Sequence, residues 1–134
     1  MTQTSQPQIW KATPFTIDRE EGKSAGTAIF RLHGPFTARD MFGTLTPIAL
    51  HDLLSFQSSP GDEPQTCHIL DLSDVPYIDS TGLGRIVGHL AHCRGKGVRM
   101  IVAAPTPRVL QLFRMTKVDS VIPITTTVEE AEIR

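Results

Sequence analysis

The chain carries Tyr77-Ile78-Asp79-Ser80-Thr81-Gly82-Leu83-Gly84 at the point where a strand-like pattern changes into a helical one. Just upstream, residues 67–72 form a short apolar run bounded by turn residues, which is typical of a buried strand. Downstream, apolar residues recur at helical spacing and predict the buried face of a helix. These are Leu83, Ile86, Val87, Leu90 and Ala91. The segment therefore joins the end of a strand to the start of a helix.

Ser80 and Thr81 are two adjacent hydroxyl residues at this helix start, and each is a natural N-cap. The first turn of a helix exposes unpaired backbone N–H groups and a partial positive charge, so it accommodates an anion. A phosphoryl group on Ser80 is therefore compatible with the fold. A serine that only caps the helix is the alternative, and on the helix pattern alone it is the commoner case.

Composition indicates one soluble globular domain with an ordinary core. The 134 residues include 13 basic and 14 acidic side chains, for a net charge of −1, so no nucleic-acid partner is predicted. No apolar run approaches the ~18 residues that span a bilayer, and residues 1–8 lack the basic and apolar parts of a secretory signal. With only two cysteines, we expect a reduced, cytoplasmic protein without a membrane partner.

The N-terminal segment differs from the rest of the chain. Residues 1–13 are rich in Thr, Gln, Ser and Pro, which predicts a flexible tail followed by one domain over residues 14–134. Trp10 is the exception in this tail, and it either folds back onto the domain or contacts a partner.

The domain opens with a predicted β-hairpin formed by residues 15–19 and 27–32. Thr37 is the expected N-cap of a first helix. Pro47 predicts that this helix breaks or restarts near that point. Residues 58–64 are predicted to form an exposed loop.

The second half of the chain alternates strands and helices. The helix after Asp79 is expected to end at the glycines of residues 95–97, and Thr106 is expected to cap a later helix. Further strands are predicted at residues 98–103 and 121–124, and further helices at 107–115 and 128–133. The order β-β-α-β-α-β-α-β-α predicts an α/β fold, with a mixed, mostly parallel sheet, an N-terminal hairpin and about four helices.

Asp-Ser-Thr-Gly-Leu-Gly at residues 79–84, placed after Ile-Leu-Asp-Leu-Ser at 69–73, resembles the signature of STAS domains. The order of elements from about Phe15 to Glu130 is also similar. Within that family the chain is most similar to the anti-sigma factor antagonists. The resemblance implies a STAS-type fold and a regulatory binding protein that is not an enzyme.

The same resemblance implies a partner switch. A serine kinase that is also the anti-sigma factor is expected to bind this protein and phosphorylate Ser80, with Thr81 as the second choice. A serine phosphatase is expected to remove the phosphate. Acidic Asp71 and Asp74, together with Asp79, are expected to lie near a phosphate at this position and to oppose its burial in an interface.

The implied partner surface lies at the start of the helix. It comprises Asp79, Ser80, Thr81, Gly82, Leu83, Gly84, Arg85 and Gly88. Asp79 is expected to accept hydrogen bonds from free backbone N–H groups of the helix, to orient the Ser80 hydroxyl or contact the kinase, or to do both. The glycines at 82 and 84 either admit the backbone of a partner or let the helix pack tightly on the sheet.

The sequence leaves two alternative functions. One is a STAS scaffold or sensor subunit of a regulatory or lipid-transport complex without sigma-factor control. The other is nucleotide binding, but the third glycine of a G-x-G-x-x-G loop is replaced by Val87 and no Gly-Lys-Ser/Thr sequence occurs, so no cofactor is predicted. His89 and His92 lie three residues apart beside Cys93, without a carboxylate at helical spacing. They are predicted to be surface histidines, and no metal site is predicted.

Overall fold

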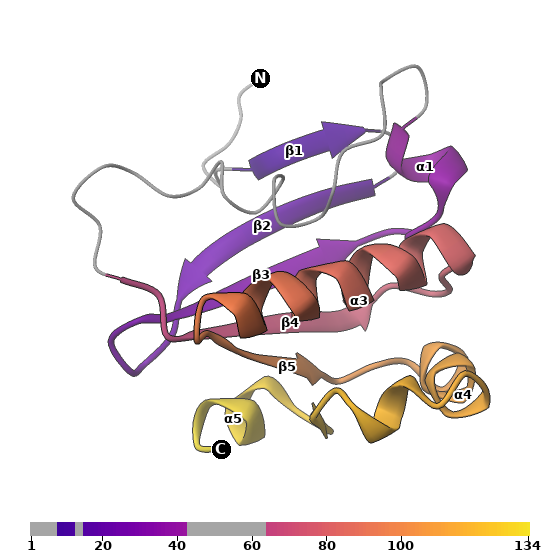
Figure 1. Cartoon of the computed structure of the whole chain (residues 1–134). Coiled ribbons are helices and arrows are strands. Elements are labelled where there is room, and N and C mark those ends of the chain that lie inside the picture. Colours follow the sequence, from indigo (N-terminus) through magenta and orange to yellow (C-terminus); the bar gives the residue numbers. More distant parts are fainter. Residues whose placement is uncertain (1–7, 13–14, 43–63) are drawn as a thin grey trace, which may run out of the picture.

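The computed structural model describes residues 8–12, 15–42 and 64–134 (Figure 1). Its elements, in chain order, are β1 (Gln8–Ala12), β2 (Phe15–Glu21), β3 (Thr27–His33), α1 (Ala38–Phe42), β4 (Cys67–Asp74), α3 (Ser80–Gly95), β5 (Arg99–Ala103), α4 (Pro107–Met115), the 3-10 turn η1 (Val118–Ser120), β6 (Ile124–Thr125) and α5 (Val128–Glu132). The predicted helix restart near Pro47, and all but the last residue of the predicted loop at 58–64, lie outside the described residues.

The strands form one mixed sheet in the order β1-β2-β3-β4-β5-β6. β2 pairs antiparallel with both β1 and β3, and the three pairings from β3 to β6 are parallel. This arrangement confirms the predicted α/β class, the N-terminal hairpin and the order of the nine predicted elements. Because β3, β4 and β5 are parallel neighbours, their carboxyl ends lie at the same end of the sheet, and the segment at 77–84 begins there.

Two predictions at the ends of the chain are wrong. The predicted flexible tail contains β1, which forms an edge strand against β2. β1 is joined to β2 by residues 13–14 and contains three apolar residues, Ile9, Trp10 and Ala12, but the Thr, Gln, Ser and Pro residues around it dominate the composition on which the tail prediction rests. The last strand is Ile124–Thr125 rather than 121–124, because the N–H groups of Val121 and Ile122 donate to the carbonyl of Val118 and extend η1 instead.

Helices cover both faces of the sheet. The main apolar cluster joins α3 and α4 to one face, through Ile86, Leu90 and Phe113 among others. A smaller cluster joins Val128 and Ala131 of α5 to the other face. Figure 1 shows α3 lying along the sheet. Among the described residues, no helix is long and apolar enough to cross a bilayer.

The buried face of α3 differs from the predicted one. Val87 is 38 % exposed and Ala91 is exposed, whereas His89 and Cys93 are 1 % exposed. The buried positions follow the spacing 82, 86, 89, 90 and 93. Gly82 sets this rotation, because it brings the start of the helix into close contact with residue 36. The apolar pattern alone gave a face turned towards Val87 and Ala91.

The predicted helix boundaries are otherwise close to the observed ones. The hydroxyl of Thr37 accepts from the N–H of Asp40 at 3.1 Å, and that of Thr106 accepts from the N–H of Val109 at 3.4 Å. Both residues therefore cap helices as predicted. α3 ends at Gly95, and Gly97 has φ +72°, a conformation that favours glycine after a helix.

Candidate functional site

Asp79 holds two helix starts together. Its Oδ1 accepts a hydrogen bond from the N–H of Gly82 at 2.9 Å and caps α3. Its Oδ2 accepts from the N–H of Ala38, the first residue of α1, at 3.1 Å. One carboxylate therefore satisfies an unpaired donor on each of two helices, and its charge is favourable beside both helix starts. The first of the two predicted roles of Asp79 is the one that the structure shows.

The segment that leads to Asp79 is fixed by backbone contacts. Ile78 forms a parallel β-bridge with Phe36, and the N–H of Phe36 donates to the carbonyl of Tyr77 at 3.1 Å. The hydroxyl of Thr106 donates to the carbonyl of Val75 at 3.1 Å. Contacts from the residues just before α1 and α4 thus position the loop between β4 and α3 and, with it, the start of α3.

Gly82 and Gly84 have different environments. A Cβ at Gly82 would lie 2.1 Å from the carbonyl oxygen of Phe36, whereas a Cβ at Gly84 or Gly88 would meet nothing within 4 Å. Gly82 is therefore required by tight packing inside the protein. Gly84 and Gly88 lie on the exposed side of α3, where a partner could approach the helix closely.

Ser80 is exposed in the first turn of α3. The predicted capping role is wrong for this residue, because Asp79 is the N-cap and Ser80 is the first residue inside the helix. Thr81 and Arg85 are partly exposed, and Leu83 packs against the core. Of the eight residues expected to form the partner surface, the exposed ones are Ser80, Gly84 and Gly88.

The acidic neighbours are arranged differently from the expectation. Asp71 is 5 % exposed, forms an ion pair with Arg31, and accepts from the N–H of Ser73 at 3.0 Å. Asp74 is exposed and lies 2.7 Å from Nδ1 of His33. Both carboxylates therefore have partners of their own, and their expected repulsion of a phosphate at Ser80 is reduced. Asp79 is the acidic residue directly beside Ser80 in the chain.

The prediction that the histidines of α3 lie on the surface is wrong for His89. Its ring is buried and contacts His68 of β4. The spacing within α3 could not reveal this contact, because the second imidazole comes from a strand 21 residues upstream. A helix wheel rotated to bury Gly82 would have placed His89 and Cys93 inward.

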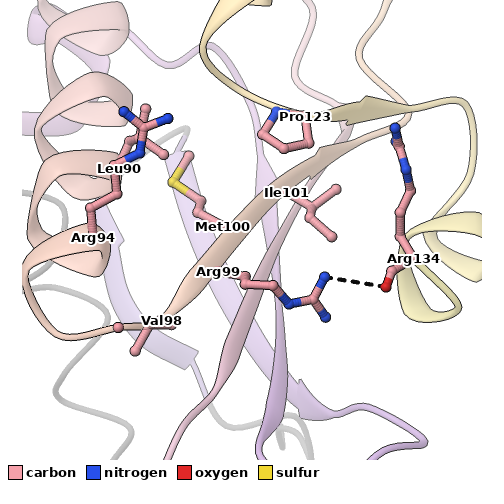
Figure 2. A pocket seen from close by; sticks show the side chains of 9 residues that line it. Leu90, Arg94, Val98, Arg99, Met100, Ile101, Pro123 and Arg134 are labelled. Carbon is pink, nitrogen blue, oxygen red and sulfur yellow. Dashed lines mark hydrogen bonds between the residues drawn. The ribbon is translucent and has the colours of Figure 1, made fainter.

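A cavity of about 450 Å³ lies at the other end of the sheet, near the start of β5 (Figure 2). Its floor includes Met100 and Ile101, and the guanidinium groups of Arg94, Arg99 and Arg134 surround it. Arg99 donates to the backbone carbonyl of Arg134 at 3.2 Å, and Arg94 to that of Val121 at 2.9 Å. None of the eight predicted partner-surface residues lines this cavity.

Comparison with known proteins agrees with this architecture. The STAS domain model matches residues 49–131, which is more than half of the chain. The chain belongs to the STAS domain family. Among solved STAS-like structures, the anti-sigma factor antagonist SpoIIAA in its unphosphorylated form has a TM-score of 0.54 at 20 % identity, with 87 % of this chain and 94 % of that chain covered. A sulfate transporter family protein from Wolinella succinogenes has a TM-score of 0.64 at 18 % identity, with 83 % and 87 % covered.

A curated relative is similar in sequence over a shorter region. It is the anti-sigma-B factor antagonist of Listeria monocytogenes, which is 34 % identical over 55 residues, or 41 % of this chain. The match spans about half the length of that relative (48 %). The structural neighbours include both an antagonist and a transporter-family protein, so the shared STAS fold alone does not distinguish the two functions.

The environments of Gly82 and Gly84 generate a prediction with a matched control on the same helix. Gly82→Ala is expected to lower the free energy of unfolding by about 2 kcal/mol or more, because the new methyl group would overlap the Phe36 carbonyl. Gly84→Ala is expected to raise it by about 0.5–1 kcal/mol, because alanine is the better helix former at an open position. Urea denaturation measures both changes. Equal effects of the two variants would contradict the packing described for Gly82.

Proposed function

We propose that this protein is an anti-sigma factor antagonist that works as a phosphorylation-controlled partner switch. In the unphosphorylated form it binds an anti-sigma factor serine kinase through the start of α3, and the bound sigma factor is released. Phosphorylation of Ser80 by that kinase ends the binding, and a serine phosphatase restores it. The proposal rests on the exposed position of Ser80 beside a cap that does not need its hydroxyl.

The division of tasks between Asp79 and Ser80 is the observation that favours a switch over a purely structural serine. Asp79 supplies the capping bonds to Gly82 and Ala38. No hydrogen bond joins the Ser80 hydroxyl to another residue within 15–42 or 64–134. Esterification of that oxygen would therefore break no contact among the described residues, and the added phosphate would lie at the positive end of a helix.

The exposed side of α3 supports the same surface as the docking site. Gly84 and Gly88 follow Ser80 at intervals of four residues, and nothing lies within 4 Å of a Cβ at either glycine. Val87, an apolar residue that is 38 % exposed, lies on the same side. A helix surface without large side chains lets a partner backbone come close to Ser80, as both binding and phosphoryl transfer require.

The electrostatic part of the switch follows from burial of the phosphate in the complex. A phosphoserine carries a charge of about −1.5 to −2 and three acceptor oxygens. In the free protein, water and the first turn of α3 solvate this charge. In a closed interface the water is lost and the Asp79 carboxylate lies one residue away. A loss of about 1.4 kcal/mol in binding free energy weakens binding tenfold, so a modest desolvation penalty for the phosphate is enough to release the partner.

Curated similarity supports the choice of partner. The matched Listeria protein is named an anti-sigma-B factor antagonist, and the matched 55 residues are 34 % identical. A STAS scaffold or sensor subunit without sigma-factor control would share the fold but not the kinase. Phosphorylation by a cognate kinase therefore separates the two functions.

The first test locates the phosphate. Incubation with the cognate anti-sigma kinase and ATP is expected to add one phosphate per chain, because Ser80 is the exposed hydroxyl in the first turn of α3. Intact-mass and peptide mass spectrometry measure the stoichiometry and the position. Ser80→Ala is expected to abolish the modification, and Thr81→Val is the matched control that should retain it. A phosphate on Thr81, or on another element, would refute the assignment.

The second test separates charge from size at the same position. Ser80→Glu is expected to weaken kinase binding at least tenfold, because a carboxylate must be desolvated in the interface. Ser80→Gln has nearly the same shape without the charge and is expected to bind more tightly than Ser80→Glu. Calorimetric titration measures both affinities, and thermal unfolding checks that both variants are folded. Equal affinities of the two variants would rule out an electrostatic switch.

A further inference from the structure

Three potential metal ligands meet beneath α3. Nδ1 of His68 lies 2.9 Å from Nε2 of His89, and Sγ of Cys93 lies 3.4 Å from the His89 nitrogen and 3.7 Å from the His68 nitrogen. His89 and Cys93 are each 1 % exposed, and His68 is partly buried. The three side chains come from two elements, β4 and α3, so their convergence is a property of the fold.

The local geometry explains why these atoms meet. His89 and Cys93 are four residues apart and share the buried side of α3. His68 lies on the same face of β4 as Leu70 and Leu72, which belong to the core cluster beneath α3. Cys67 packs in the cluster on the other face of the sheet. The Phe30 ring packs on His68 in a T-shaped arrangement, with the centroids 5.0 Å apart, and helps to hold this imidazole in place.

The spacing of the three atoms fits a small coordination sphere. Bonds of about 2.0–2.1 Å to imidazole nitrogen and about 2.3 Å to thiolate sulfur, at tetrahedral to trigonal angles, place ligand atoms about 3.3–3.8 Å apart. For sulfur and nitrogen the same bonds give about 3.6–3.8 Å. The 3.7 Å distance from Cys93 to His68 matches this value, and the 3.4 Å distance from Cys93 to His89 is about 0.2 Å shorter. The two nitrogens are closer, at the distance of an imidazole–imidazole hydrogen bond, and the two rings are within 12° of parallel. A cation would replace that hydrogen bond, and a small turn of each ring would widen the nitrogen–nitrogen distance.

We propose that His68, His89 and Cys93 form a binding site for one thiophilic d10 cation, Cu⁺ or Zn²⁺. Imidazole and thiolate together are ligands that these two ions prefer. The bound ion would link α3 to β4 about two and a half to three and a half turns beyond Ser80 in the helix, independently of the switch proposed above. On binding, the Cys93 thiol loses its proton to solvent and both imidazoles donate neutral nitrogen lone pairs.

Protonation states are compatible with this donor set. Burial lowers the pKa of His68 to about 4, so its imidazole is neutral at pH 7. Burial also raises the pKa of Cys93 to about 11, so the ion must displace a proton from the thiol. Formation of the site therefore releases one proton per chain.

Charge favours the monovalent ion. No carboxylate belongs to the cluster within the described part of the chain, and the positive charge of Arg19 acts on His68. One thiolate neutralises Cu⁺, whereas Zn²⁺ would leave a net positive charge in a buried site. Cu⁺ is also satisfied by three ligands, whereas Zn²⁺ in proteins takes a fourth. Cu⁺ is therefore expected to bind more tightly than Zn²⁺.

The experiment uses the full chain, stripped of metal by a chelator. Cu⁺ is titrated without oxygen against a chromogenic competitor, and Zn²⁺ is titrated in a parallel series. One ion per chain is expected, with a rise in melting temperature on binding, and X-ray absorption of the complex should show one sulfur and two nitrogen ligands. Cys93→Ser is expected to lower the affinity for the ion at least about tenfold. Loss of a residue that only hydrogen-bonds to a metal ligand already costs about that much, and loss of a ligand itself should cost no less. Cys67→Ala is the matched control that should keep the affinity.

The outcomes separate clearly. Absence of stoichiometric binding of both ions to the wild-type chain would overturn the proposal, and the cluster would then be a buried hydrogen-bonded group only. Binding that survives in Cys93→Ser, or that is lost in Cys67→Ala, would overturn it as well. Circular dichroism checks that the variants fold. If Cys93→Ser does not fold, His68→Gln at the partly buried position replaces it, with the same expected loss.

Discussion

The Asp79 carboxylate, shared between the starts of α1 and α3, is the contact on which the rest of the site depends. Each oxygen accepts from one helix, through the N–H of Gly82 and the N–H of Ala38. The bonds require close approach of the two helices, and Gly82 makes this possible by leaving room for the Phe36 carbonyl. Helix capping, glycine packing and the rotation of α3 are therefore parts of one constraint.

This constraint explains how the proposed modification of Ser80 could take place at a helix start without weakening the fold. A cap residue that was itself phosphorylated would lose its hydrogen bond, and the helix end would lose about 1 kcal/mol. Here the cap, Asp79, and the proposed acceptor, Ser80, are adjacent but separate residues. The fold therefore leaves Ser80 exposed on a rigid element, and the proposed switch can act on binding while the domain stays folded.

Features that depend on neighbouring residues in the sequence were predicted correctly more often than features that depend on contacts between elements. The strand-to-helix change at residues 77–84, the caps at Thr37 and Thr106, and the glycine end of α3 all depend on neighbouring residues, and the structure confirms them. β1 was missed because its five residues lie within a segment whose composition is dominated by Thr, Gln, Ser and Pro, although the strand itself contains Ile9, Trp10 and Ala12. The inward position of His89 follows from the contact of Gly82 with Phe36, which a helical pattern does not contain. The pairing of Asp71 with Arg31 likewise joins two strands 40 residues apart.

The separation of tasks between Asp79 and Ser80 is tested most directly by comparing the unfolding free energies of Asp79→Ala and Ser80→Ala in urea. Loss of Asp79 removes bonds to two helix starts, so a decrease of about 2 kcal/mol or more is predicted. Loss of the Ser80 hydroxyl is predicted to change stability by no more than about 0.5 kcal/mol. A larger loss for Ser80→Ala than for Asp79→Ala would show that the serine supports the fold and would contradict the account.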